Sequence, residues 1–385
     1  MRNAIGDPVS GENFTNREKE LKGAIHLLEN QNSFLLLGIR RTGKSSFLLE
    51  LAKQLDERDD NIVVQLNCQG YQSPLQFYKE LHEALPKDLK TRLGKLLTDS
   101  RQLPSKLIES LTGGIKVLEA GGVKLEFKSE WDVYTSPLDN LLGSFFKENS
   151  NVILFLDELP FFFQNLSYSK EQVREIQKIL TSLRTWRDAG LAMGIAGSLN
   201  LHLQLDNLGI SRKLIAGLNT LKLEPFTREE AKSLLEKLLE NKNLNWWTNE
   251  ITEKVLDLLP DYVPYFLQLT FHHIVVNEAS TPEEVEQVFH NDIQPNFQAD
   301  FTYQFDERLA KFSNDELPAA QAILDYVVKN EVAAFSEMQK ELGEKFQYDA
   351  LTKLIDFEFL TLRERERYAF SLNILRNWWR QKRNL

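Results

Sequence analysis

The chain has 385 residues, more than one compact hydrophobic core usually holds, so we expect two or three domains. Hydrophobic residues make up 42% of it and charged residues 26%, as is typical of a folded globular protein. The net charge of −10 argues against a surface that binds nucleic acid everywhere, although a local basic patch is compatible with it. The single cysteine, Cys68, excludes an internal disulfide framework, and its apolar surroundings favour a strand residue over a nucleophile.

Targeting signals are not evident in the sequence. No apolar run approaches the roughly 20 residues that span a bilayer, and the amino terminus lacks the apolar core of a signal peptide. We therefore expect a cytoplasmic protein with no membrane partner.

The first elements form a strand and a helix on either side of a glycine-containing loop. Residues 16–29 have the apolar spacing of a helix. An apolar strand is expected at 33–37, and a helix at 46–55 follows the intervening loop. A second buried strand is expected near 62–66.

Residues 74–93 are predicted to form one helix, with core spacing at Leu75, Tyr78, Leu81, His82 and Leu85. His82 lies on its apolar face, where a packed histidine is more common than a ligand. The pattern weakens over 94–135, and the alternation at 113–128 predicts a hairpin with glycine-bearing turns. We interpret 94–135 as an insertion, or at least as an excursion off the main sheet.

The next segments alternate again between helices and apolar strands. Helices are expected at 137–148 and 170–189, and strands at 152–156, 191–198 and 220–225. Continuous apolar runs are typical of strands buried on both faces of a parallel sheet. Residues 1–226 are therefore predicted to form an α/β domain with βαβ connections.

After Pro225 the strand pattern stops. Thr227 and Glu230 have the spacing of a capping box that opens a helix to about 241. Further helices are expected near 248–259, 264–278 and 281–290. We predict a helical lid at 227–312.

The carboxyl-terminal pattern is different. Helices are expected at 317–329, 336–342 and 348–357, followed by a two-stranded wing at 359–371. Three helices and a wing are typical of a winged helix-turn-helix, which we assign to 313–385.

The loop after the first strand carries the most specific motif. Gly38, Gly43, Lys44 and Ser45 match the GxxxxGK[ST] spacing of a Walker A phosphate loop, between a strand and a helix as that motif requires. Backbone N–H groups of such a loop surround a phosphate, and the following helix directs the positive end of its dipole at the same anion. Lys44 is placed to reach the β- and γ-phosphates, and the Ser45 hydroxyl to bind Mg²⁺.

We therefore expect ATP and Mg²⁺ as cofactors. The residues predicted to contact nucleotide in this loop are Gly38, Ile39, Arg40, Arg41, Thr42, Gly43, Lys44, Ser45 and Ser46. Arg40 and Arg41 occupy variable positions of the motif, where a side chain faces solvent or a regulatory partner.

Asp157 and Glu158 end a buried strand, which is where α/β folds collect ligand groups. Asp157 is predicted to complete the Mg²⁺ shell, and Glu158 to polarise the water that attacks the γ-phosphorus. The alternative is a pair of acids in a loop without this role. Arg212 is a candidate for offsetting transition-state charge in cis or from a neighbouring subunit, and a solvated loop arginine is the alternative.

The whole chain resembles the archaeal-type, STAND-related AAA ATPases, close to the origin-recognition-like AAA+ modules. The matching segments are Val9–Leu21, Gly38–Ser45, Val152–Pro160, Gly197–Ser198, Pro225–Thr227 and Asp261–Gln268. The resemblance implies an α/β P-loop NTPase with an AAA+-like parallel sheet, an α-helical lid and a C-terminal winged helix-turn-helix.

The resemblance also implies roles for individual residues. The segment that holds Phe14 and Arg17 lies against the adenine base in that family, and Ser198 has the place of the residue that senses the γ-phosphate. A serine that caps the next helix is the alternative for Ser198. Pro264 belongs to the family's GxP segment, which does the work of sensor 2, but this chain has Asp261-Tyr-Val where a glycine is expected.

A winged helix in this family binds DNA, binds protein or covers the nucleotide lid. The segment 348–359 carries three acids against one lysine, which is poor for following phosphates. Arg363–Arg367 and Arg376–Arg383 are better candidates for DNA contact. The alternative for the second is a tail helix that docks Trp378 and Trp379 on the body and leaves its basic face solvated.

The leading hypothesis is an ATP-binding and hydrolysing molecular switch, with slow or partner-stimulated turnover, that couples nucleotide state to a protein partner or to DNA. The rival is a DNA-acting AAA+ regulator of the loader or transposition type, whose subunits assemble on duplex. A nucleotide-dependent homo-oligomer is compatible with both. A nucleotide-binding scaffold without turnover is disfavoured because Glu158 is present.

Overall fold

The computed structural model describes residues 1–58, 61–100, 103, 105–111, 137–167, 169–197, 201–240, 242–363 and 366–385. The chain divides into two compact units. Unit 1 comprises Met1–Asn16, Gly38–Gly43 and Leu223–Leu385, and unit 2 comprises Arg17–Leu37 and Lys44–Lys222. The hairpin predicted at 113–128 lies outside the described residues, as does most of the predicted insertion.

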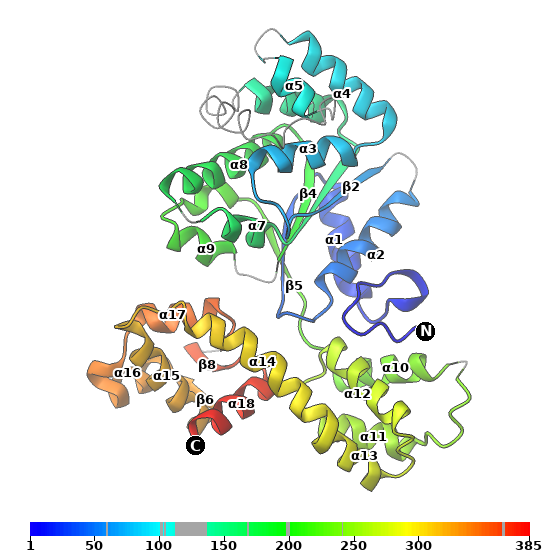
Figure 1. The fold of residues 1–385 in the computed structure, drawn as a ribbon, viewed down its shortest axis with the longest axis vertical. Coiled ribbons are helices and arrows are strands. Elements are labelled where there is room, and N and C mark those ends of the chain that lie inside the picture. The colour runs from blue at the N-terminus through cyan, green and yellow to red at the C-terminus, as the bar shows by residue number, and fades with distance from the viewer. Residues whose placement is uncertain are drawn as a thin grey trace. The chain divides into compact units, whose positions relative to one another are not determined.

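Unit 2 is built on a parallel sheet of five strands, and the predicted parallel α/β architecture is confirmed (Figure 1). The strands are β1 (Phe34–Leu37), β2 (Ile62–Asn67), β3 (Val152–Asp157), β4 (Ala192–Ala196) and β5 (Asn219–Lys222), in the order β2-β3-β4-β1-β5. Strand β4 pairs with both β1 and β3, so Gly194 is in register with Phe34 on one side and with Phe155 on the other. Because all the strands are parallel, their carboxyl ends lie at one edge of the sheet, where the phosphate loop follows β1 and Asp157 ends β3.

The helices of unit 2 cover this sheet. They are α1 (Glu18–Glu29), α2 (Lys44–Asp56), α3 (Pro74–Ala84), α4 (Lys87–Asp99), α5 (Ser105–Leu111), the helix at 137–148, α7 (Leu159–Asn165), α8 (Lys170–Asp188), α9 (Leu201–Asn207) and the 3-10 turn Arg212–Ile215. The single helix predicted at 74–93 is wrong. Leu85 is extended ahead of Pro86, which has no N–H to donate, so α3 ends and α4 begins. Helix α7 was not predicted, and no bounds were predicted for α9.

An aromatic cluster fills the core of unit 2. Phe77 stacks on Trp186, with ring centroids 6.5 Å apart, and on Phe162, with centroids 6.1 Å apart. His82 is buried, and burial lowers the pKa of its imidazole, as expected for a packed histidine that is neutral at pH 7. Cys68 is also fully buried.

Unit 1 contains the helices and the short strands that follow residue 223. These are α10 (Arg228–Leu239), α11 (Asn249–Leu258), α12 (Pro264–Val276), α13 (Pro282–Val288), the π-helical turn Phe289–Ile293, α14 (Gln294–Leu309), α15 (Glu316–Asn330), β6 (Val332–Ala334), α16 (Phe335–Leu342), α17 (Tyr348–Asp356), β7 (Leu360–Arg363), β8 (Arg367–Phe370) and α18 (Asn373–Arg383). The capping box predicted at Thr227 and Glu230 is confirmed at the start of α10.

Helix α14 was not predicted, and it joins the two halves of unit 1. Pro295 interrupts the helical pattern in the sequence, but it lies in the first turn of α14, where its missing N–H breaks no bond of that helix. Phe297 packs on Phe266, with centroids 4.5 Å apart, and Phe305 packs on Phe359, with centroids 4.9 Å apart. The helices after Pro225 and the carboxyl-terminal elements therefore share one hydrophobic core.

The carboxyl-terminal strands form an antiparallel sheet in the order β6-β8-β7. Strands β7 and β8 occupy the segment predicted as a two-stranded wing, and β6 was not predicted. In α18, Trp379 is fully buried and its indole Nε1–H donates to Asp325 at 2.9 Å, while Trp378 is also buried. The tail helix therefore docks on the body through its two tryptophans. No helix among the described residues is long and apolar enough to span a bilayer.

Candidate functional site

The loop between β1 and α2 has a tight, specific backbone. Thr42 donates to the Ile39 carbonyl from its amide, at 3.2 Å, and from its hydroxyl, at 2.7 Å. A Cβ on Gly38 would lie 2.9 Å from both the Leu223 carbonyl oxygen and Thr42 Oγ1, so only glycine fits at that position.

Two residues of this loop have positive φ. Gly43 has φ +91°, with open space where a Cβ would be, so the conformation and not the space requires glycine there. Arg41 has φ +73°, which is uncommon for a residue with a side chain. Successive residues that alternate in the sign of φ turn their N–H groups toward one concave side, and such a loop can bind an anion.

Helix α2 begins at Lys44, directly after this loop. The N–H groups of its first turn have no partner within the helix, and its dipole favours a negative charge at this end. Lys44 is only 6% exposed. A buried lysine at the amino terminus of a helix is an arrangement suited to phosphate.

Asp157 lies close to these groups at the end of β3. Its backbone carbonyl accepts from the Cys68 amide at 2.8 Å, and its side chain accepts from the Glu158 amide at 3.0 Å. Burial raises the pKa of Asp157, while a hydrogen bond from the Ser45 hydroxyl and the charge of Lys44 act in the opposite direction. The structure therefore brings Lys44, Ser45 and Asp157 together, as their positions in the sequence predicted.

Glu158 follows with left-handed backbone angles, φ +55° and ψ 30°, at the first turn of α7. Its carbonyl accepts from the amides of Phe161 and Phe162, at 3.0 and 3.2 Å, and these bonds hold the turn. Strained backbone of this kind costs energy and is concentrated at functional sites. The strain sharply redirects the chain at the residue predicted to act on water.

The other residues predicted for unit 2 have different outcomes. Ser198 lies outside the described residues. Arg212 forms an ion pair with Asp206, in which its Nε donates to Oδ1 at 2.7 Å, and the side chain is half exposed. Arg17 is buried and its guanidinium donates to Glu20 at 3.1 Å.

In unit 1, the amino-terminal segment packs on the helices that follow Pro225. Asn16 donates to the Glu230 carbonyl at 2.6 Å, and Asn3 donates to the Gln268 carbonyl at 3.2 Å. Phe14, predicted to lie against the base, is partly buried in this segment. The segment is therefore held against α10 and α12.

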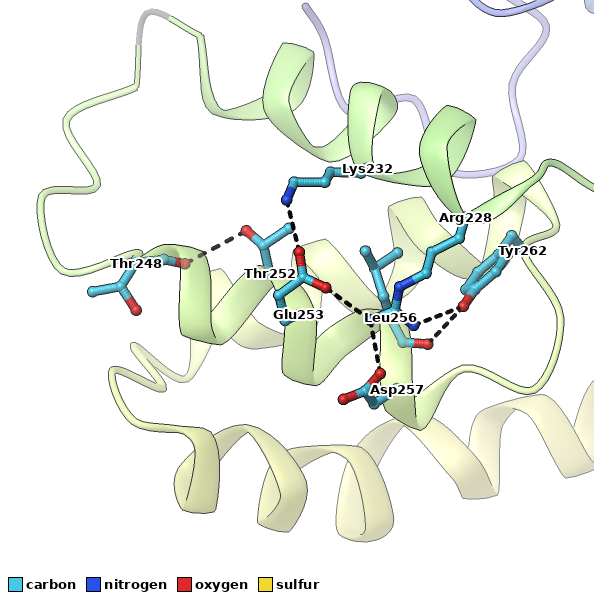
Figure 2. A network of polar contacts seen from close by, with 8 residues as sticks. All are labelled: Arg228, Lys232, Thr248, Thr252, Glu253, Leu256, Asp257 and Tyr262. Atoms are coloured by element: carbon cyan, nitrogen blue, oxygen red, sulfur yellow. Dashed lines mark hydrogen bonds and ion pairs between the residues drawn. The ribbon is translucent and has the colours of Figure 1, made fainter.

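Pro264 is the first residue of α12, and the loop before it is fixed by a polar network that Figure 2 shows. The Arg228 guanidinium donates to the Tyr262 hydroxyl at 3.2 Å, to Glu253 at 2.8 Å and to Asp257 at 2.7 Å. The Tyr262 hydroxyl in turn donates to the Leu256 carbonyl at 3.1 Å (Figure 2). The start of α12 is thus tied to α10 and α11.

Two residues near the predicted site were not identified in the sequence. Asn67 ends β2 in register with Asp157. Its position as a polar residue at the end of an apolar strand could have identified it from the sequence. Tyr265 contacts Arg41 of the phosphate loop, with the guanidinium carbon 4.4 Å from the ring centroid. No local pattern could have found that contact, because 224 positions separate the two residues (265 − 41).

Comparison with known proteins supports this fold. No protein-family model matches the sequence, and no curated protein matches it. A solved Walker-type ATPase of Pyrococcus abyssi matches with a TM-score of 0.66 and 18% identity, over 99% of this chain and 100% of that one. The chain has the fold of that Walker-type ATPase.

A second solved structure shares the fold. The ORC2 protein of Aeropyrum pernix, solved as ADPNP–ADP complexes, matches with a TM-score of 0.53 and 12% identity, over 99% of this chain and 98% of that one. Both similarities extend over nearly the whole length of this chain, so they include the elements of unit 1 as well as the sheet of unit 2.

Proposed function

We propose that the protein is an ATP-binding and hydrolysing switch of the origin-recognition-like, STAND-related AAA type. The observation that carries the proposal is the hydrogen bond between Ser45 of the phosphate loop and Asp157 of β3, beside the buried Lys44. A cation, a hydroxyl and a carboxylate are the groups that bind a nucleoside triphosphate with its metal ion. The nucleotide complexes of the Aeropyrum pernix ORC2 protein, which has the same fold, support this choice of ligand.

The residues from Gly38 to Ser46 bind the phosphates in this proposal. The positive φ values at Arg41 and Gly43 turn loop amides inward, and the first turn of α2 adds further N–H groups. Lys44 neutralises the charge of the β- and γ-phosphates.

Ser45 and Asp157 would hold Mg²⁺, and their oxygen donors fit that ion. Mg²⁺ usually takes one or two protein ligands and completes its shell with waters and phosphate oxygens. When bound, the ion offsets the charge that develops on the transferred phosphoryl group.

Glu158 acts as the general base in the proposal. Its carboxylate accepts a proton from the attacking water and orients the oxygen toward the γ-phosphorus. The left-handed backbone at Glu158 directs this residue away from the line of β3. Hydrolysis then converts bound ATP to ADP and phosphate.

Further roles are proposed for residues outside this centre. Phe14 and Arg17 contact the base, Pro264 belongs to the lid segment that contacts nucleotide, and Ser198 senses the γ-phosphate. Arg212 stabilises transition-state charge. It can do so only after its ion pair with Asp206 opens, so it acts when a conformational change or a neighbouring subunit separates the two.

Residues 227–312 are the lid in this proposal and 313–385 the winged helix, and together they report nucleotide state to a protein partner. Four of the basic side chains in 313–385 are held in ion pairs. Arg376, Lys382 and Arg383 of α18 form ion pairs with Glu331, Asp306 and Asp325. Lys353 of α17 is paired with Glu316 at 2.6 Å. These pairs favour a protein over duplex DNA as the partner.

Binding and turnover test the central claim. Lys44→Ala is expected to weaken ATP binding at least about tenfold, because it removes a buried phosphate contact worth roughly 1.5–3 kcal/mol. Lys53→Ala, which removes an exposed lysine from the same helix, is the matched control. ATP affinity is measured by titration calorimetry in the presence of Mg²⁺, and equal affinities for the two variants would refute the assignment.

Glu158→Gln is expected to keep ATP affinity and to lower the rate of phosphate release by about 100-fold or more. Unchanged turnover would remove Glu158 from its role.

Adding duplex DNA at low salt tests whether the partner is DNA or a protein. Strong binding that falls steeply with salt, or stimulation of turnover by duplex, would replace the proposed protein partner with DNA.

A further inference from the structure

Arg41 of the phosphate loop makes a specific contact with helix α12. Its guanidinium carbon lies 4.4 Å from the centre of the Tyr265 ring, a cation–π geometry. The amino-terminal segment covers the pair, since a Cβ on Gly6 would lie 3.1 Å from an Arg41 guanidinium nitrogen and 3.9 Å from the Tyr265 ring. All three residues belong to unit 1.

The backbone and side chain of Arg41 are unusual in two respects. The backbone has φ +73°, although glycine is the residue that tolerates such angles. The side-chain Nε is buried and has no hydrogen-bond partner in the part of the chain that the structure describes. A strained residue with an unsatisfied buried donor is retained only when it serves a further purpose or the surroundings enforce it.

The other end of the same lid segment contacts the carboxyl-terminal helix. Asp261 accepts from the Ile374 amide at 2.8 Å and from the Asn373 side chain at 3.2 Å. Leu372, at the cap position of α18, provides no side-chain cap of its own. Asp261 therefore caps α18 from a distant segment, and its charge complements the helix dipole.

The residues between these two contacts are held firmly. The Tyr262 carbonyl accepts from the Phe226 amide at 2.9 Å, and its hydroxyl lies in the Arg228 network of Figure 2. Val263 is fully buried and precedes Pro264, whose ring fixes φ at the start of α12. A displacement at Tyr265 is therefore not absorbed by a loose loop before it reaches Asp261.

We infer that the segment Asp261–Tyr265 is a mechanical link that carries nucleotide state from the phosphate loop to α18. The inference rests on the proposed function and names the regulation of that site. Phosphate binding changes the loop at Arg41, Tyr265 follows the guanidinium, and Asp261 transmits the movement to the first turn of α18.

Hydrogen exchange on the full chain tests this link, with Mg²⁺ and a non-hydrolysable ATP analogue as the probe. In the wild type, binding of the analogue is expected to change amide exchange rates by at least about fivefold, which is the lower end of the coupling usually measured between two sites. The change is expected in the first turn of α12 and at residues 377–380 of α18. Tyr265→Leu is expected to lose both changes, whereas Tyr265→Phe keeps the ring and retains them.

A second pair of variants tests the far end independently. In Asp261→Ala, analogue binding is expected to change exchange rates in α12 but no longer in α18. Asp261→Asn still offers a hydrogen-bond acceptor and is expected to retain most of the change in exchange rate in α18. A full response of α18 in Tyr265→Leu or in Asp261→Ala would overturn the inference, as would a wild type that binds the analogue without responding at α18. A wild type that binds no analogue would overturn the proposed function and the link together.

Discussion

Asp139 carries a prediction about stability and pH that does not depend on the nucleotide. It lies in the helix at 137–148, where the Tyr78 hydroxyl donates to it at 2.9 Å. Burial raises the pKa of Asp139 from its ordinary value of 3.8 to about 6, while hydrogen bonds from Ser182 and Tyr78 act in the opposite direction. The folded protein therefore keeps a proton on Asp139 that the unfolded chain releases at lower pH.

The sign and the magnitude follow from linkage. The folded pKa lies above the unfolded one, so this contribution to stability is present below about pH 4 and is lost as the pH rises through 6. A shift of about two units corresponds to about 3 kcal/mol. Asp139→Asn is neutral at every pH, so we expect its free energy of unfolding to rise relative to wild type by about 2 kcal/mol between about pH 4.5 and 7.5.

Urea unfolding of the full chain measures this difference. A fluorine-labelled tryptophan reports on unit 2 through Trp186, whose ring centroid lies 5.9 Å from that of Tyr78. Asp188→Asn, which removes an exposed acid from α8, is the matched control and is expected to show no such trend. A difference between Asp139→Asn and wild type that stays constant over this pH range, or that falls with rising pH, would refute the reasoning.

Three further changes have expected outcomes. Gly43→Ala should lower the melting temperature and weaken ATP binding about tenfold, because φ +91° strains a residue with a Cβ; calorimetry measures both. Thr227→Ala removes the cap of α10 and should destabilise unit 1 by about 1 kcal/mol in urea unfolding. Trp379→Leu should cost about 3 kcal/mol in the same assay, because it leaves a cavity and strips Asp325 of one donor.

The features that the sequence predicted correctly are local ones. The phosphate loop is defined by spacing within eight residues, and the capping box at Thr227 by spacing within four. The runs of apolar residues at β3 and β4 predicted the parallel sheet. A strand that is buried on both faces has apolar residues at every position instead of alternating apolar and polar ones. In each case the residues that decide the structure are neighbours in the chain.

The failures involve proline and long-range contacts. The apolar spacing runs on across Pro86, so periodicity alone could not separate α3 from α4. Helix α14, which starts just before Pro295, was not predicted. The cap that Asp261 provides to α18 and the Arg41–Tyr265 contact depend on tertiary folding, and neither has a local signature.

The buried thiol of Cys68 has a practical consequence. It is the single cysteine of the chain, it is fully buried, and burial raises its pKa well above the ordinary value, so it reacts poorly with alkylating dyes. Cysteines introduced at exposed positions would therefore be labelled selectively, without the need to replace Cys68. Tyr303 in unit 1, which is 70% exposed, and Asp188 in unit 2 are suitable positions for a donor and an acceptor dye. Energy transfer between them would measure, molecule by molecule, the distance between the two units with and without added nucleotide.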